Sequence, residues 1–332
     1  MPEFRQDIVT KRWVILAQER AKRPEDFREP VQTKRAHHVD SCPFCAGNED
    51  QTPPELHRVI APSGWRVRTV PNKFPALTMD GDVVEGQVGI FRTMSGVGSH
   101  EVVIESPDHD ASPATLSVDH LADVIRSYIQ RYHVLCADER LQYIQIFRNH
   151  RKLAGASLEH PHSQLIAMPF VPRQVQAEMD AASEHWKHTG ECVYCRMIRG
   201  EIRATSRVVC ANDMFVAVCP FASRVPFETW ILPLQHQASF GQLADSAAQQ
   251  FAGILRCVLN GLASLNDPAY NYMVYTAPLG SDYADAPHLH WRMEILPKLS
   301  ITAGFELGTG VFINVSTPED AARFLRTAAS ST

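Results

Sequence analysis

The feature that most constrains the fold of this chain is an internal repeat. The segment 101–112 returns as 228–239 with its glutamate, its histidine and an Ala-Ser pair in register. Each copy follows a Cys-x-x-Cys pair, at 42–45 and 192–195, and each precedes an amphipathic stretch, a β-type stretch and a His-x-His triplet. Four landmarks in the same order are hard to obtain by chance, so we infer the duplication of one structural unit.

Each unit is expected to combine a helix with antiparallel strands. Residues 141–147 alternate between polar and apolar side chains, and 101–105 and 271–275 are short β-type runs, so all three predict strands. The apolar residues of 117–135 and of 251–262 keep helical spacing, which predicts one amphipathic helix in each unit. The pattern indicates an α+β fold in which helices pack on antiparallel sheets.

Four of the eight cysteines form the two Cys-x-x-Cys pairs, and structural disulfides are uncommon in a reducing compartment. Paired thiolates with two distant imidazoles are typical of closed tetrahedral zinc sites, whereas neither pair opens a helix after a strand as a redox pair would. Four protein ligands leave no open position, so each ion would have a structural role. The predicted ligands are Cys42, Cys45, His109 and His160 in the first unit, and Cys192, Cys195, His236 and either His288 or His290 in the second.

The stretch 155–169 carries the residues best suited to chemistry. Gly155-Ala-Ser157 is a small-residue turn that lets an oxygen-rich group such as phosphate approach the backbone. His160 and His162 then alternate at the start of a run typical of a buried strand, so we expect both rings on one side of a sheet. A neutral imidazole beside a phosphate site favours attack on phosphorus, and metal binding by His160 would leave His162 free for it. Two histidines that merely cap a core strand are the alternative.

Composition argues against several classes of protein. The chain has 332 residues, enough for two domains, and a formal net charge of −5. Nucleic acid and anionic membrane surfaces call for a basic patch, which this composition does not favour. The first residues lack the basic-then-apolar order of a signal peptide, and no apolar run approaches the roughly 18 residues of a membrane span. We expect a cytoplasmic protein that binds neither nucleic acid nor membranes.

Four motifs of the first unit occur together: Cys42-x-x-Cys45, Ser106-Pro-Asp-His109, Gly155-x-Ser157 and His160-Pro-His162-Ser-Gln164. In this combination the chain resembles the galactose-1-phosphate uridylyltransferases, a nucleotidyl-transferring branch of the histidine triad superfamily. The resemblance covers nearly the whole chain, from Arg20 to Glu306. It implies two tandem histidine-triad-like domains. Residues 1–175 would form the catalytic domain with the first zinc site, and 176–332 would carry the second zinc site and a sugar or acceptor segment.

By this resemblance His162 would be the nucleophile that forms a nucleotidyl-histidine, and Gln164 would donate a hydrogen bond to the transferring phosphoryl group. UDP-glucose would load the histidine, and a hexose 1-phosphate such as galactose 1-phosphate would take the nucleotidyl group in a ping-pong cycle. The resemblance also implies two structural zinc ions per chain and a homodimer. It assigns contacts with the nucleotide sugar and its phosphates to Arg20, Arg23, Asn72, Asn149, Gly155, Ser157, Phe305 and Glu306.

Some residues depart from this pattern and are closer to a neighbouring family. Ser163 follows the second histidine where the uridylyltransferases usually have Gly, and Lys73 follows Asn72 where Asp is frequent. The His-x-His-Ser-Gln motif, the second cysteine pair and 304–310 are closer to the ADP-glucose phosphorylases, which load a histidine but pass the nucleotide to inorganic phosphate. In those relatives the residue matching His290 binds the second zinc, so we choose His290. We expect a uridylyltransferase first, an ADP-glucose phosphorylase as the alternative, and a zinc-stabilised nucleotide-binding protein without turnover third.

Overall fold

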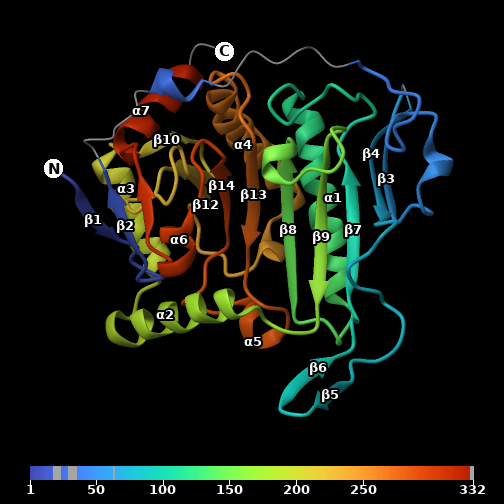
Figure 1. Ribbon diagram of the computed structural model, residues 1–332, viewed down its shortest axis with the longest axis horizontal. Coiled ribbons are helices and arrows are strands. Elements are labelled where there is room, and N and C mark those ends of the chain that lie inside the picture. Colours follow the sequence, from blue (N-terminus) through green and yellow to red (C-terminus); the bar gives the residue numbers. More distant parts are fainter. Residues whose placement is uncertain (18–23, 29–35, 63, 330–332) are drawn as a thin grey trace.

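One ten-stranded antiparallel sheet runs through the described part of the molecule (Figure 1). The computed structural model describes residues 1–17, 24–28, 36–62 and 64–329. Across the sheet the strands are β10 (Val208–Ala211), β11 (Phe215–Val218), β12 (Thr229–Pro233), β14 (Arg292–Pro297), β13 (Tyr270–Tyr275), β8 (Tyr143–His150), β9 (His162–Met168), β7 (Ser99–Ile104), β4 (Gly64–Pro71) and β3 (His57–Ala61).

The strand order has the symmetry that a duplication predicts. Counted outward from the centre, β8 corresponds to β13, β9 to β14, β7 to β12, β4 to β11 and β3 to β10. The two expected sheets are joined into one, because β8 pairs with β13, with Arg148 opposite Tyr272. This pairing gives both central strands a neighbour on each side and leaves no open sheet edge at the junction. The division into domains at residues 175 and 176 stays a prediction.

Two helices, α1 (Val118–Cys136) and α4 (Ala248–Ala263), pack on each other and cover one face of the sheet. In Figure 1 they lie behind the strands. Helix α1 begins at Ser117, whose hydroxyl accepts a hydrogen bond from the backbone N–H of His120 and so caps the helix. The apolar faces of both helices meet the strands in one core that spans the two halves. Both helices expected from apolar periodicity are therefore confirmed.

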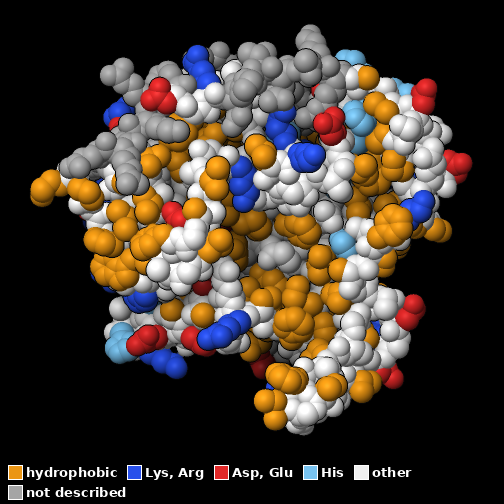
Figure 2. All heavy atoms as spheres, in the orientation of Figure 1, with side chains coloured by type: hydrophobic (Ala, Val, Ile, Leu, Met, Phe, Trp, Pro, Cys, Tyr) orange, Lys and Arg blue, Asp and Glu red, His pale blue; other side chains and the backbone are white. Residues whose placement is uncertain are grey.

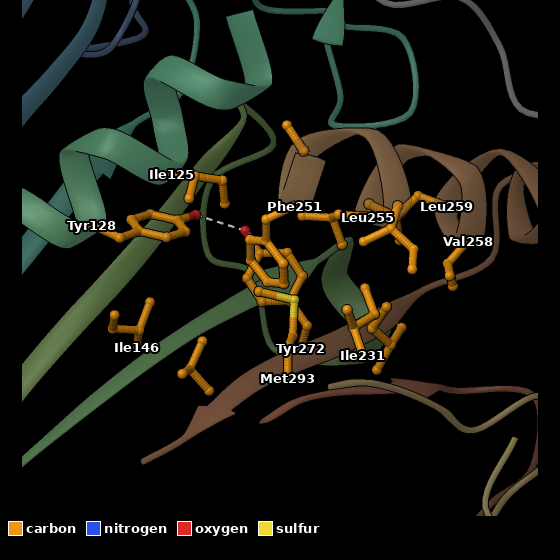
Figure 3. Packing of buried hydrophobic residues seen from close by; sticks show 14 of the residues in the cluster. Ile125, Tyr128, Ile146, Ile231, Phe251, Leu255, Val258, Leu259, Tyr272 and Met293 are labelled. Atoms are coloured by element: carbon orange, nitrogen blue, oxygen red, sulfur yellow. Dashed lines mark hydrogen bonds between the residues drawn. The ribbon is translucent and has the colours of Figure 1, made fainter. Parts of the chain in front are cut away.

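A buried polar cluster lies between α1 and the central strands. The Tyr128 hydroxyl donates to Ser163 Oγ over 2.6 Å and lies 2.7 Å from the Tyr272 hydroxyl (Figure 3). Beside them, Arg148 and Glu105 form an ion pair whose side chains are 2% and 0% exposed. Tyr272 belongs to the second half and the other four residues to the first. The cluster therefore connects the two halves on the α1 side of the sheet.

The opposite face is covered over the second half of the sheet and open over the first. Helices α2 (Arg173–Thr189) and α3 (Val193–Ala204) share an apolar cluster with β11 and β12. Figure 2 shows this face hollowed in the middle, with hydrophobic side chains around the hollow. The remaining elements are β1 (Glu3–Gln6), β2 (Trp13–Leu16) and β15 (Phe312–Asn314), which form a small sheet, the protruding hairpin of β5 (Glu85–Val88) and β6 (Phe91–Met94), and α5 (Ser281–Ala284), α6 (Gly304–Thr309) and α7 (Pro318–Ala329).

Within the residues described, no helix combines the length and the hydropathy needed to cross a bilayer.

Arg148→Met is expected to destabilise the protein far more than the loss of a surface ion pair. The variant leaves the Glu105 carboxylate buried without its partner, which costs roughly 3–5 kcal/mol in comparable pairs. The control is Arg92→Met, which breaks an exposed pair with Glu85 on the β5–β6 hairpin and should cost less than about 1 kcal/mol. Urea unfolding of both variants measures the difference. Equal costs would mean that the buried pair contributes no more than a surface contact.

Candidate active site

A cavity of about 470 Å³ opens on the uncovered face of the first half. Strand β9 brings His162 and Gln164 into its wall, because alternate side chains of a strand point to the same face. Val102 of the neighbouring strand β7 lies opposite Gln164 in the same wall. The volume is in the range of small-molecule sites. The other lining residues are Pro43, Phe44, Gln51, Thr52, Pro53, Val70, Pro71, Asn72, Lys73, Phe74, Ser157 and Leu158.

His162 presents an unprotonated nitrogen to this cavity. Its Nδ1 lies 2.8 Å from the carbonyl oxygen of His160, and because a carbonyl oxygen only accepts, Nδ1 carries the proton and donates it. The single proton of the neutral ring is then used, so Nε2 keeps its lone pair. Burial lowers the pKa of His162, which favours this neutral form. The rings of both histidines pack against Phe44, with centroid distances of 5.6 Å for His162 and 5.9 Å for His160.

Gln164 lies two residues further along β9, on the same face as His162. Its Oε1 is 2.7 Å from Nε2 of His100 on the neighbouring strand β7. Ser163, between the two site residues, points to the other face and accepts the hydrogen bond from Tyr128. The serine that departs from the uridylyltransferase pattern therefore adds its side chain to the α1 side of the sheet and does not narrow the cavity.

The small-residue turn after β8 is supported from the second half. Gly155 has a φ of 91°, a left-handed conformation that glycine adopts without strain. Asn271 of β13 donates through Nδ2 to Oδ1 of Asn149 and to the carbonyl of Ala154, both over 2.8 Å. The Asn149 amide is thereby turned with its own NH2 group toward the carbonyl of Gly155, 3.4 Å away. Ser157, beyond the turn, lines the cavity, whereas Asn149 and Gly155 are not among its lining residues.

Asp267 of the second half holds the strand end that leads into this turn. Its carboxylate accepts from His150 Nε2 over 2.8 Å and pairs with the Arg151 guanidinium. Arg151 has a φ of 69° and a ψ of 163°, a left-handed φ with an extended ψ that costs a non-glycine residue roughly 1–3 kcal/mol. Burial alone would raise the pKa of Asp267, but His150 and Arg151 hold it well below its usual range. The ion pair therefore helps to keep the start of the turn in its left-handed conformation.

Cys42, Cys45, His109 and His160 converge on one point, as the sequence predicts. The Nδ1 atoms of the two histidines are 3.3 Å apart, and Cys45 Sγ lies 3.4 and 3.6 Å from them. Metal–nitrogen and metal–sulfur bonds of about 2.05 and 2.3 Å give tetrahedral edges of about 3.3 and 3.6 Å. His160 donates from Nε2 to the carbonyl of Ser106 over 2.8 Å, which leaves Nδ1 to face the cluster. These four residues could hold one metal ion.

A second cluster of the same kind lies in the second half. Its ligand atoms lie within 4.8 Å of one another, and its residues are Cys192, Cys195, His236 and His290. His290 donates from Nε2 to the carbonyl of Pro233 over 3.0 Å, so its Nδ1 faces the thiolates as in the first cluster. His288, which a strict reading of the repeat favours, is not a member of the cluster. The choice of His290 agrees with this geometry.

An arginine takes the place of the free histidine in the second half. Strand β9 begins at His162 and β14 at Arg292, in each case two residues after the histidine of the metal cluster. Arg292 is 3% exposed and pairs with Glu178 of α2 and with Glu294, each over 2.7 Å. Glu294 in turn stands where the first half has Gln164. A permanently charged guanidinium between two carboxylates fills this position and offers no lone pair for nucleophilic attack.

The structure brings part of the predicted site together. His162, Gln164, Asn72 and Ser157 line the cavity. Phe305 and Glu306 lie on α6 and are not among its lining residues, and Glu306 instead accepts the backbone N–H of Ala303 at the start of that helix. Arg20 and Arg23 lie outside the described residues.

Three residues that support the site were missed by the sequence analysis. His100 and Asn271 touch the site residues Gln164 and Asn149, and Asp267 pairs with Arg151 at the start of the turn that leads to the site, all far away in the chain. No local motif marks them, because their roles arise from strand neighbours and from the β8–β13 junction. The only signal in the sequence was the repeat, which predicts that the two units lie together but not which side chains meet.

Comparison with known proteins finds relatives that match nearly the whole chain. A family model described as galactose-1-phosphate uridyl transferase, N-terminal domain, matches residues 1–172, and one described as a domain of unknown function matches 97–328. ADP-glucose phosphorylase of Arabidopsis thaliana is 39% identical over 98% of this chain and 92% of its own. Galactose-1-phosphate uridylyltransferase of Thermotoga maritima is 30% identical over 98% of both chains.

Solved structures give the same assignment. The Arabidopsis thaliana ADP-glucose phosphorylase with bound ADP-glucose superposes with a TM-score of 0.82 at 37% identity, over 98% of each chain. A structure described as uridylyltransferase has a TM-score of 0.78 at 27% identity, over 100% of this chain and 99% of that one. Fold and relatives together define a nucleotidylyltransferase on a duplicated α+β scaffold. Because the first family model matches more than half of the chain, the protein belongs to the galactose-1-phosphate uridylyltransferase family.

Asp267→Asn is expected to lower stability at neutral pH and to do so less in acid. A carboxyl group whose folded-state pKa is depressed contributes stability above its unfolded pKa of about 3.9 and loses that contribution as the pH falls. The gap in unfolding free energy between wild type and variant should therefore shrink below about pH 4. Urea unfolding as a function of pH measures it, with Asp213→Asn, at an exposed position, as the control. A gap independent of pH would contradict the ion pair.

Proposed function

We propose that this protein transfers a nucleoside monophosphate from a nucleotide sugar to an acceptor through a covalent intermediate on His162. One observation carries the proposal: His162 lines the cavity and its Nδ1 lies 2.8 Å from the His160 carbonyl oxygen, so that Nε2 is the nitrogen left with a lone pair. A lone pair placed in this way can attack phosphorus. The accepting carbonyl stabilises the positive charge that the ring gains during the attack.

The reaction takes two in-line steps that use one pocket. In the first, Nε2 attacks the α-phosphorus and the bond to the bridging oxygen breaks, so the sugar 1-phosphate leaves with the electron pair. In the second, an acceptor oxygen attacks the same phosphorus, and the phosphorus–nitrogen bond breaks to return the electron pair to Nε2. The Gln164 amide donates to the phosphoryl oxygens, whose charge must be stabilised in both steps. By the family resemblance, Asn72 and Ser157 also contact the nucleotide.

We favour ADP-glucose as the donor and inorganic phosphate as the acceptor, the reaction of an ADP-glucose phosphorylase. The relative with that name is 39% identical to this chain, against 30% for the Thermotoga maritima uridylyltransferase over the same share. This difference supports the phosphorylase ahead of the uridylyltransferase that the motifs alone favour. The second candidate is UDP-glucose–hexose-1-phosphate uridylyltransferase, which the family model over residues 1–172 supports. A binding protein without turnover has no use for the His162 lone pair.

We further propose that both Cys/His clusters bind zinc. Two thiolates with two imidazoles suit Zn²⁺, and the nitrogen–nitrogen and nitrogen–sulfur distances of the first cluster fit its bond lengths. With four protein ligands the ion is closed to substrate and holds structure. In the first cluster it would also anchor His160, whose carbonyl orients His162. By the same resemblance we propose that the protein is cytoplasmic and forms a homodimer. Light scattering of the purified protein would test the dimer.

Intact-protein mass spectrometry with one donor at a time tests the reaction. ADP-glucose should add the mass of one adenylyl group, and inorganic phosphate should then remove it. Labelling by UDP-glucose and discharge by galactose 1-phosphate would instead favour the second candidate. His162→Asn keeps an amide that can donate to the His160 carbonyl but has no nucleophile, so turnover should fall by at least about four orders of magnitude.

The metal content and melting temperature of His162→Asn serve as its control, and both should match those of the wild type. A variant that loses metal together with activity would make His162 a ligand and would overturn its role as the nucleophile.

Removal of one cysteine ligand from either cluster tests the two proposed zinc sites one at a time. Cys42→Ser and Cys192→Ser should each lower the zinc content from two ions to about one per chain and lower the melting temperature, because structural zinc contributes directly to folding. Only Cys42→Ser should also slow nucleotidylation, since only the first cluster contains His160. Elemental analysis and the labelling assay measure both effects. Full zinc content in either variant would contradict the assigned ligands.

A further inference from the structure

His100 is the residue in contact with Gln164 that no motif singles out. It lies on β7 opposite Ile166 of β9, so its side chain shares a face of the sheet with Gln164. Its Nε2 is 2.7 Å from Oε1 of Gln164, and its Nδ1 is 3.1 Å from the backbone nitrogen of Ala76. These two contacts determine how the Gln164 amide is turned.

The Ala76 contact fixes the tautomer of His100. A backbone N–H can only donate, so Nδ1 of His100 must be its unprotonated acceptor. The one proton of the ring is then on Nε2, which donates to Gln164. A group that receives this proton must present an oxygen, so the amide oxygen of Gln164 faces His100 and its NH2 group is the end left for the cavity.

Asn72 lies beside this pair without disturbing it. Its Oδ1 accepts the backbone N–H of Phe74 over 2.9 Å, so the nitrogen end of its amide faces Nε2 of His100 at 3.1 Å. Two N–H groups cannot donate to each other, so this contact adds no hydrogen bond. Asn72 therefore does not compete with Gln164 for the single ring proton.

We propose that His100 is a positioning residue that holds the NH2 group of Gln164 toward the transferring phosphoryl group, an inference that rests on the proposed function. The amide torsion of glutamine has two broad, roughly equivalent orientations. A half-turn would aim an oxygen at the phosphoryl oxygens and repel them, whereas the NH2 group stabilises the charge that they carry in the transition state. The His100 proton makes the half-turn unfavourable. Gln164 thus stays aligned before the substrate arrives.

A merely structural role, in which His100 anchors the loop at Ala76, needs to be separated from this one. His100→Asn does so, because the Asn Oδ1 stands near the position of Nδ1 and can accept the Ala76 N–H, but the shorter side chain cannot reach Gln164. His100→Gln carries an acceptor and a donor at the end of a longer side chain and is the rescue variant. His133→Asn, on the exposed side of α1, is the matched control.

The experiment measures the single-turnover rate of nucleotidylation of His162 by ADP-glucose, or by UDP-glucose if only that donor labels the wild type. His100→Asn should be slower by about ten- to a hundredfold, somewhat less than the roughly 10²–10³ that loss of one oxyanion donor costs. The ADP-glucose concentration for half-maximal rate should change little, because the lost interaction belongs to the transition state. In a Gln164→Ala background His100→Asn should have no further effect. His100→Gln should recover part of the rate, and His133→Asn should match the wild type.

Three outcomes overturn the proposal. A wild-type rate in His100→Asn, or losses that simply add in the double variant, would show that His100 does not act through Gln164. If His100→Asn does not fold, His100→Phe keeps the ring volume and must show the same loss and the same lack of additivity.

A wild-type protein that ADP-glucose and UDP-glucose both fail to label would overturn the proposed function, and the positioning role with it. If the wild type is labelled and the His100 variants are labelled at the same rate, only the positioning role is overturned.

Discussion

One hydrogen bond, from Nδ1–H of His162 to the carbonyl oxygen of His160, sets the chemistry of the cavity. It uses the single proton of a neutral ring, so the nitrogen that meets the ligand is a lone pair. The accepting carbonyl belongs to a residue that is itself fixed at both ring nitrogens, by the Ser106 carbonyl on one side and by the first Cys/His cluster on the other. The orientation of His162, the proposed nucleophile, therefore depends on a cluster of which it is not a member. Without that anchor His162 would still lie in the cavity wall, but nothing would determine which nitrogen carries its proton.

The two units use one scaffold for different purposes. In the first, the sheet face is left open and the residue two places after the cluster histidine is His162. In the second, α2 covers the face and the corresponding Arg292 is satisfied by buried carboxylates. The second unit nevertheless acts on the site, because Asp267 and Asn271 reach across the β8–β13 junction to the turn that precedes His162. The second unit thus has an arginine where the first has His162, and it supports the site of the first unit.

Sequence reasoning succeeded where the chemistry is encoded by spacing, and it failed where it depends on long-range contacts. The Cys-x-x-Cys spacing marked two ligands of each cluster, because metal sites need fixed residue types, and the repeat supplied the distant histidines. The repeat predicted the matching order of strands and helices, but not that the halves would share a single sheet, since edge-to-edge pairing leaves no mark in the hydrophobic pattern. The offset between His160 and His290 exceeds that between His109 and His236, so the repeat alone favours His288, and the resemblance is what points to His290, the residue found in the cluster. His100 could not be found, because its role needs a neighbouring strand and a backbone N–H from another loop.

The first Cys-x-x-Cys turn shapes the cavity as well as the cluster. Pro43 and Phe44 stand between the two cysteines, and both line the cavity. The turn is closed by the N–H of Cys45, which donates to the Cys42 carbonyl, so ligands and cavity wall are parts of one rigid segment. One part of the cavity wall is built from this segment and residues 51–53, whereas His162 and Gln164 come from β9. Under the proposed function, the base and the phosphoryl group would then be contacted by separate elements. We propose that this separation lets relatives named for ADP-glucose and for galactose 1-phosphate share one fold, since the cysteine segment can change while His162 stays in place.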